Sequence, residues 1–168
     1  MKAIGLRTAL CVLGVVLGFC APATAGKAVP FKGCFVGALT SRTPIVPPVF
    51  EDRFDISGHA THLGEFDLVI DAIVEFGNIP VTGEGTYTFT AANGDILVAQ
   101  FTGHSALVQP GLVLITEEAT IDPELSTGRF AGATGGFTVE RLADAATGVN
   151  GLTLGHFEGT ISRPRKGK

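Results

Sequence analysis

Tryptophan is absent from this sequence, tyrosine and methionine occur once each, and only 17% of the residues are charged. There are three cysteines, and two of them, Cys11 and Cys20, lie in the first 25 residues. A disulfide framework needs at least one pair of cysteines. The rest of the chain keeps only Cys34, so its stability must come from an apolar core.

Sequence motifs of the common enzyme classes are also missing. There is no Gly-x-Ser-x-Gly nucleophile elbow, no P-loop, no Cys-x-x-Cys pair and no Asp-x-Asp-x-Asp-Gly calcium loop. The glycine-rich run at 128–136 is followed by the strand-like residues 137–139, whereas a dinucleotide fingerprint opens a helix. Hydrolase, kinase and redox functions therefore have no support, and we expect no cofactor.

The first 25 residues have the features of a secretory signal peptide. Lys2 and Arg7 supply positive charge, residues 8–19 are apolar, and Ala23-Thr24-Ala25 is a small-residue cleavage site. We therefore expect residues 1–25 to be removed and the protein to be secreted or periplasmic. A lipoprotein anchored at Cys20 is an alternative, which the large Phe19 before it disfavours.

Residues 26–168 form a chain of the usual size for one globular domain. Removal of residues 1–25 takes away two of the twelve basic residues and none of the sixteen acidic ones, which leaves a net charge of −6. Nucleic acid is disfavoured as a partner, because its binding needs many Lys and Arg side chains. No later apolar run approaches the roughly 20 residues of a membrane-spanning helix, so no transmembrane segment is expected after signal removal.

Apolar and polar residues alternate along residues 63–76. The even positions hold Phe66, Leu68, Ile70, Ala72, Val74 and Phe76, and the odd positions include Glu65, Asp67, Asp71 and Glu75. A period of two directs one face of a strand into a core and the other into water. A straight row of carboxylates on a solvated face does not make a cage for a cation, so we expect no metal site here.

Further strand-like segments cover most of the remaining chain. They are residues 31–36, 49–58, 86–91, 95–104, 112–121, 128–134, 136–142 and 152–162. Asn93-Gly94 predicts a hairpin with a type I′ turn, because both of its central residues then need a positive φ. Pro110-Gly111 marks another turn, and Pro44, Pro47 and Pro48 indicate a long connection after the first strand.

These segments predict an all-β fold with about eight or nine antiparallel strands and hardly any helix. A closed barrel is favoured over a sandwich, because closure removes exposed sheet edges. About eight strands leave an interior just wide enough for side chains or one small ligand. An outer-membrane barrel would have to turn the acidic face of residues 65–75 into its lumen, and is disfavoured.

The most distinctive run of the chain is Gly128–Arg141, with the sequence GRFAGATGGFTVER. Phe130 and Phe137 can enter a core while the small residues let neighbouring backbones approach. The run resembles the glycine-rich signature of the dirigent and allene oxide cyclase-like β-barrel superfamily, particularly its small secreted bacterial members of unknown function. Similar stretches occur at residues 58–64, 90–95 and 157–162.

This resemblance implies an eight-stranded antiparallel calycin-like barrel with an apolar cavity, often in an oligomer. Plant relatives use the cavity to cyclise a fatty-acid epoxide without a cofactor or to orient phenoxy radicals during coupling. The chain departs from the family pattern at residues 122–126, where a shorter glycine-rich turn is common. The plant catalytic residues map onto no matching position here, so none is transferred.

Three kinds of residue could take part in catalysis or binding: Glu117, Cys34 and the histidines. Glu117 interrupts the apolar face of residues 113–121, and we expect it to pair with Arg129 or Arg141 or to line a ligand cavity. Cys34 lies in an apolar run and is expected to be a buried thiol. The histidines lie near expected strand ends and are interpreted as polar caps, not as zinc ligands.

Binding of a small apolar ligand inside the barrel is the function that the sequence favours. The candidate pocket-lining residues are Phe66, Leu68, Ile70, Tyr87, Phe89, Phe101, Glu117 and Phe137. The same side chains could instead fill the core. Two alternatives stay open: a cofactor-free cyclase or dirigent-like enzyme in which Tyr87 or Glu117 orients an apolar substrate, and a structural module of the cell envelope. A homo-oligomer is compatible with each.

Overall fold

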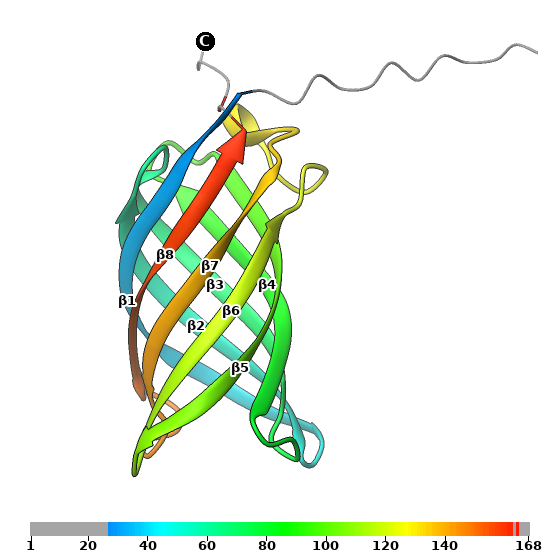
Figure 1. Ribbon diagram of the computed structural model, residues 1–168, viewed down its shortest axis with the longest axis vertical. Coiled ribbons are helices and arrows are strands. Elements are labelled where there is room, and N and C mark those ends of the chain that lie inside the picture. The colour runs from blue at the N-terminus through cyan, green and yellow to red at the C-terminus, as the bar shows by residue number, and fades with distance from the viewer. Residues whose placement is uncertain (1–26, 163, 165–168) are drawn as a thin grey trace, which may run out of the picture.

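The structure is a computed structural model that describes residues 27–162 and 164. The expected signal peptide, with Cys11 and Cys20, lies outside the described residues. Eight strands follow one another: β1 (Ala28–Val46), β2 (Val49–Ala60), β3 (Gly64–Glu75), β4 (Val81–Ala91), β5 (Ile96–Gln109), β6 (Leu112–Ile121), β7 (Gly135–Asp144) and β8 (Leu152–Ser162). Each strand is antiparallel to the next and β8 pairs with β1, which confirms the predicted closed barrel (Figure 1).

The alternation of β3 directs its side chains as the sequence predicts. Phe66, Leu68 and Ile70 are buried, whereas Asp67 and Asp71 on the other face are exposed. The strand pairs with β4 in a register that places Leu68 opposite Phe89 and Ile70 opposite Tyr87, so apolar side chains of both strands enter the barrel together. Within the described residues, no helix is both long and apolar enough to cross a membrane.

The first strand is longer than the sequence suggested. We expected Pro44, Pro47 and Pro48 to lie in a long connection, but β1 continues to Val46 and only Pro47 and Pro48 separate it from β2. The strand accommodates Pro44 because the register with β2 shifts between Pro44 and Val46. Such an irregularity is one of the few places where a sheet tolerates a residue without an N–H donor.

The glycine-rich run differs from its prediction over residues 128–134. A strand was expected there, but Gly128–Phe130 form one turn of 3₁₀ helix (η1) and β7 begins at Gly135. Gly128 has a φ of 58°, and a Cβ on it would lie 1.8 Å from a carboxylate oxygen of Asp95. This conformation directs Phe130 into the barrel end, where it is fully buried.

The hairpin predicted at Asn93-Gly94 is present, but its turn is not type I′. Only Gly94 has a positive φ, of 83°. The N–H of Gly94 donates to the carbonyl of Ala91 at 2.8 Å, and the N–H of Ala91 donates to the carbonyl of Asp95 at 3.0 Å. This pattern fits a three-residue loop that ends on a left-handed glycine. The dipeptide therefore located the turn, while the loop is one residue longer than expected.

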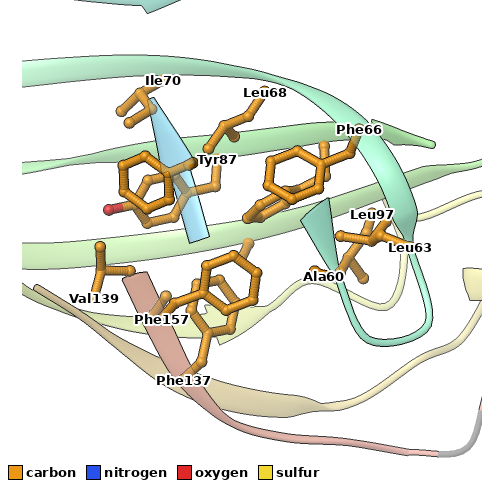
Figure 2. Packing of buried hydrophobic residues seen from close by; sticks show 14 of the residues in the cluster. Ala60, Leu63, Phe66, Leu68, Ile70, Tyr87, Leu97, Phe137, Val139 and Phe157 are labelled. Atoms are coloured by element: carbon orange, nitrogen blue, oxygen red, sulfur yellow. The ribbon is translucent and has the colours of Figure 1, made fainter. Parts of the chain in front are cut away.

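The two ends of the barrel differ. The β1–β2, β3–β4, β5–β6 and β7–β8 connections lie at one end, here called the open end, and η1 and both ends of the described chain lie at the other, the closed end (Figure 1). The closed half holds an aromatic cluster of Phe31, Phe66, Phe89, Phe137 and Phe157; Phe66, Phe137 and Phe157 are labelled in Figure 2. Ring centroids of its neighbouring pairs are 4.9 to 6.3 Å apart. These rings fill the closed half.

Truncation of Phe89 tests this packing. The ring is fully buried and contacts other rings of the cluster, so Phe89→Ala should lower the free energy of unfolding by about 3–5 kcal/mol. Urea unfolding followed by circular dichroism measures the loss. The control is Leu125→Ala at an exposed position, which should change the free energy by less than about 1 kcal/mol. Equal effects of the two substitutions would contradict a packed closed half.

Candidate ligand-binding cavity

The open half of the barrel contains a cavity of about 640 Å³. Its volume lies within the range of small-molecule sites. The cavity exists because small residues occupy inward positions here, namely Ala72, Gly83, Gly103 and Ala143. Apolar side chains make most of the remaining wall, among them Leu39, Phe54, Val74, Phe101, Val113 and Ile115. The strands that carry phenylalanines in the closed half thus leave space in the open half.

A buried ion pair forms the floor of the cavity. Glu117 on β6 and Arg141 on β7 are both 3% exposed. Arg141 Nε donates to Glu117 Oε2 at 3.0 Å and Nη2 donates to Oε1 at 2.9 Å, a bidentate arrangement. The Tyr87 hydroxyl also donates to Glu117 Oε2. Figure 2 shows this hydroxyl pointing away from the closed-end turn between Ala60 and Leu63.

A second ion pair borders the same cavity. Arg42 Nε on β1 donates to Asp52 Oδ1 on β2 at 2.7 Å, and Arg42 Nη2 donates to Oδ2. Asp52 is buried, whereas Arg42 is 31% exposed. The Arg141 guanidinium also lies over the Phe54 ring, 4.5 Å from its centroid. Each cation around the cavity is therefore matched by one carboxylate, and the formal charges of the four groups sum to zero.

The surroundings of Tyr87, Arg141 and Arg42 determine their protonation states. Burial raises the pKa of Tyr87 well above its usual value, and the nearby negative charge of Glu117 raises it further. Burial lowers the pKa of Arg141, but the charge of Glu117 and its hydrogen bonds outweigh this effect and leave the pKa raised. The hydrogen bond to Asp52 raises the pKa of Arg42. At neutral pH Tyr87 is a neutral donor and both arginines are cations.

One donor at the floor is left without a partner. Among the described residues, the buried side-chain atoms that lack a hydrogen bond are Arg129 Nε and Arg141 Nη1. Arg141 borders the cavity and Arg129 does not. The Glu117 carboxylate, by contrast, already accepts three hydrogen bonds. Arg141 Nη1 is therefore a buried donor without a partner, which is an unfavourable arrangement.

The eight candidate residues predicted from the sequence all point inward, and none is more than 4% exposed. Only Phe101 and Glu117 border the cavity; Phe66, Leu68, Ile70, Phe89 and Phe137 pack below it, and Tyr87 lies at the floor. Glu117 has Arg141 as its partner, as one of the two predicted pairings requires. Arg129 instead lies 3.6 Å from Asp95.

Sequence reasoning missed Arg42, Asp52 and Phe54 at the cavity. Asp52 had the same signal as Glu117, because it shares the inward face of β2 with Phe54 and Ile56. The expectation of a buried Cys34 was wrong. Phe35 and its alternate neighbours on β1 point inward, so Cys34 is exposed on the outer face. In the described part of the chain, no group of three or more His, Cys, Asp or Glu side chains is arranged to hold a metal ion.

Comparison with known proteins gives no relative: no family model, curated protein or solved structure matches this chain. The similarity of the glycine-rich run to the dirigent and allene oxide cyclase-like superfamily therefore stays a prediction from motifs.

Tyr87 is the only tyrosine of the chain, so absorbance at alkaline pH reports on the cavity floor directly. Since the folded-state pKa lies above the unfolded value of about 10, Tyr87 contributes stability below that pH and the contribution is lost as the pH rises toward the folded-state pKa. The folded protein should show no phenolate signal at the pH where the urea-unfolded protein is half ionised. A reversible titration at the ordinary tyrosine pKa in the folded protein would contradict the buried contact.

Separation of the Glu117–Arg141 pair tests its structural role. Glu117→Gln leaves a buried cation without its counter-charge, and should lower the free energy of unfolding by about 3–5 kcal/mol. The double variant Glu117→Leu/Arg141→Met removes both charges and should recover most of this loss. Glu118→Gln, one residue away on the exposed face, is the control for the chemical change. Equal stability of Glu117→Gln and Glu118→Gln in thermal unfolding would rule out the pair as a structural element.

Proposed function

We propose that this protein binds one small, mainly apolar molecule in the open half of the barrel. The observation that carries the proposal is an apolar-walled cavity of about 640 Å³ with one ion pair at its floor and a second at its border. Pockets for small molecules combine largely apolar walls with a few fixed polar groups in this way. The predicted signal peptide supports an exported location, so binding would take place in the periplasm or outside the cell.

The charge balance of the floor selects the class of ligand. Both arginines already hold bidentate carboxylate partners. A ligand carboxylate would bring an uncompensated negative charge into a poorly solvated site or displace one of those partners, and both are costly. A neutral molecule, such as an ester, ketone or alcohol, brings no charge, and its chain can contact the apolar walls while both ion pairs stay intact. We therefore propose a neutral amphiphile.

Catalysis is the weaker alternative for this site. Tyr87 and Glu117 lie at the floor, where a cofactor-free cyclase would need its acid or base. Tyr87, however, keeps its proton because burial raises its pKa, and the Glu117 oxygens are engaged by three donors. A general acid or base must exchange a proton with the substrate, which these contacts oppose. An envelope module with no ligand would have no use for a cavity of this size.

Native mass spectrometry of the exported protein tests the proposal most simply. The protein should carry a noncovalent adduct of a small neutral molecule that organic extraction releases. If it is isolated empty, titration with lauryl alcohol or methyl laurate should change the fluorescence of Tyr87, which no tryptophan obscures. An empty protein that responds to neither molecule would remove the binding function.

A matched acid tests the ligand class separately. Methyl laurate should bind at least about tenfold more tightly than laurate, because the acid brings a charge that the site does not neutralise. Isothermal titration at neutral pH measures both affinities. Equal affinities would overturn the neutral class while leaving apolar binding intact.

A side chain added inside the cavity should block the site. Ala143 lines the cavity on β7, so Ala143→Phe directs a ring into the space that the ligand needs and should lower affinity for methyl laurate at least about tenfold. The control is Ala38→Phe, the same substitution on the outer face of β1, which should bind as the unchanged protein does. Loss of binding in both variants would place the ligand elsewhere.

A further inference from the structure

The turns of the open end expose apolar side chains around the mouth of the cavity. These residues, here called the collar, are Ile45, Val46, Phe76, Ile79, Leu107, Val108 and Val149. Phe76, Ile79 and Val149 lie in the connections at this end, and the other four are among the last residues of β1 and β5. Ile79 is 101% exposed, Leu107 72% and Val46 69%. Exposed apolar residues are ordinary when scattered singly, but a ring of them around one opening marks an interaction site.

The collar is also free of charge. Residues 44–50, 76–81, 106–113 and 145–151, which form the four turns and their flanks, contain no Lys, Arg, Asp or Glu. The nearest charges are the Arg42 guanidinium, which lies over the Phe76 ring, and the Glu75 and Asp144 carboxylates, which accept from N–H groups of the turns. A partner at the mouth therefore meets mainly apolar side chains, and the charges beside them already have partners within the protein. Attraction between opposite charges contributes little to holding such a partner.

Many backbone groups of these turns do not need a hydrogen-bond partner from outside the protein. Prolines at 47, 48, 80 and 110 have no N–H to satisfy. The N–H of Phe76 donates to the carbonyl of Pro48, and that of Asn150 to the carbonyl of Leu39. The Ala146 and Thr147 N–H groups donate to the Asp144 carboxylate. Internal satisfaction of backbone donors is what an apolar medium demands of a segment that enters it.

We propose that the collar docks on a lipid surface of low charge, with the cavity mouth facing the acyl chains. Separate tips that stand clear of the barrel can each enter a fluid layer, whereas a rigid protein partner would need a matching pocket for every tip. The collar offers neither the charges nor many of the hydrogen bonds that accompany a protein interface. The charged strand faces behind it would limit insertion to the turns. Docking does not depend on the proposed ligand, but it would open the cavity toward a source of neutral amphiphiles.

Sedimentation with phosphatidylcholine vesicles tests the docking. The variant Val46→Asp/Val108→Asp adds two charges to the collar at positions that do not border the cavity. It should bind vesicles at least about tenfold more weakly than the unchanged protein, since the apolar contacts of both side chains are lost. The control Val36→Asp/Leu125→Asp adds the same charge at similarly exposed positions, one on the outer face of β1 and one at the closed end. It should bind vesicles normally.

Further measurements separate this proposal from its competitors. Both variants should bind methyl laurate in solution as the unchanged protein does, so loss of docking is distinguished from loss of the ligand site. Binding should not increase with anionic lipid and should change little with salt. The proposal is overturned if the unchanged protein does not sediment with the vesicles, if it binds only anionic vesicles, or if the collar variant binds normally. Self-association that the collar variant abolishes, without vesicle binding, would assign the collar to a second copy of the chain.

Discussion

The ion pair between Glu117 and Arg141 is the interaction on which the rest of this structure depends. It lies inside a barrel that could otherwise be filled by apolar side chains, and removal of either partner would leave a buried charge unpaired. Its partners come from the neighbouring strands β6 and β7, and Tyr87 reaches Glu117 from β4, so the contact ties together strands that lie up to three places apart in the sheet. The pair thereby separates a closed half packed with phenylalanines from an open half with a cavity.

The open half is built for uncharged molecules along its whole length. The turns around the mouth carry no charged residue, the walls are mainly apolar, and the charges at the floor are matched within the protein. A neutral amphiphile can occupy this space without disturbing either of the two ion pairs. The proposed ligand class and the proposed lipid surface therefore have one physical origin, the exclusion of unpaired charge.

The sequence predicted the fold well and the cavity only in part. Alternation in residues 63–76 determines which side chains of β3 point inward, and Glu117 was recognised because a carboxylate interrupted an apolar face. Alternation does not tell packed inward residues from those that border empty space. That outcome depends on the summed side-chain volumes of all strands at one level of the barrel. In the final register Gly83 lies opposite Gly103, and Ala72 lies opposite Gly85. The turn at residues 128–130 was missed because left-handed glycines bend the chain within an apparently strand-like run.

Xenon binding in crystals tests the division of the barrel most directly, because xenon occupies apolar space that side chains leave free. Xenon should occupy the open half, against Phe54, Phe101 and Ile115, with the Glu117–Arg141 pair intact below it. No xenon should lie among Phe31, Phe89 and Phe157. Xenon within that aromatic cluster, or an open half that takes up no xenon because side chains fill it, would contradict the central claim.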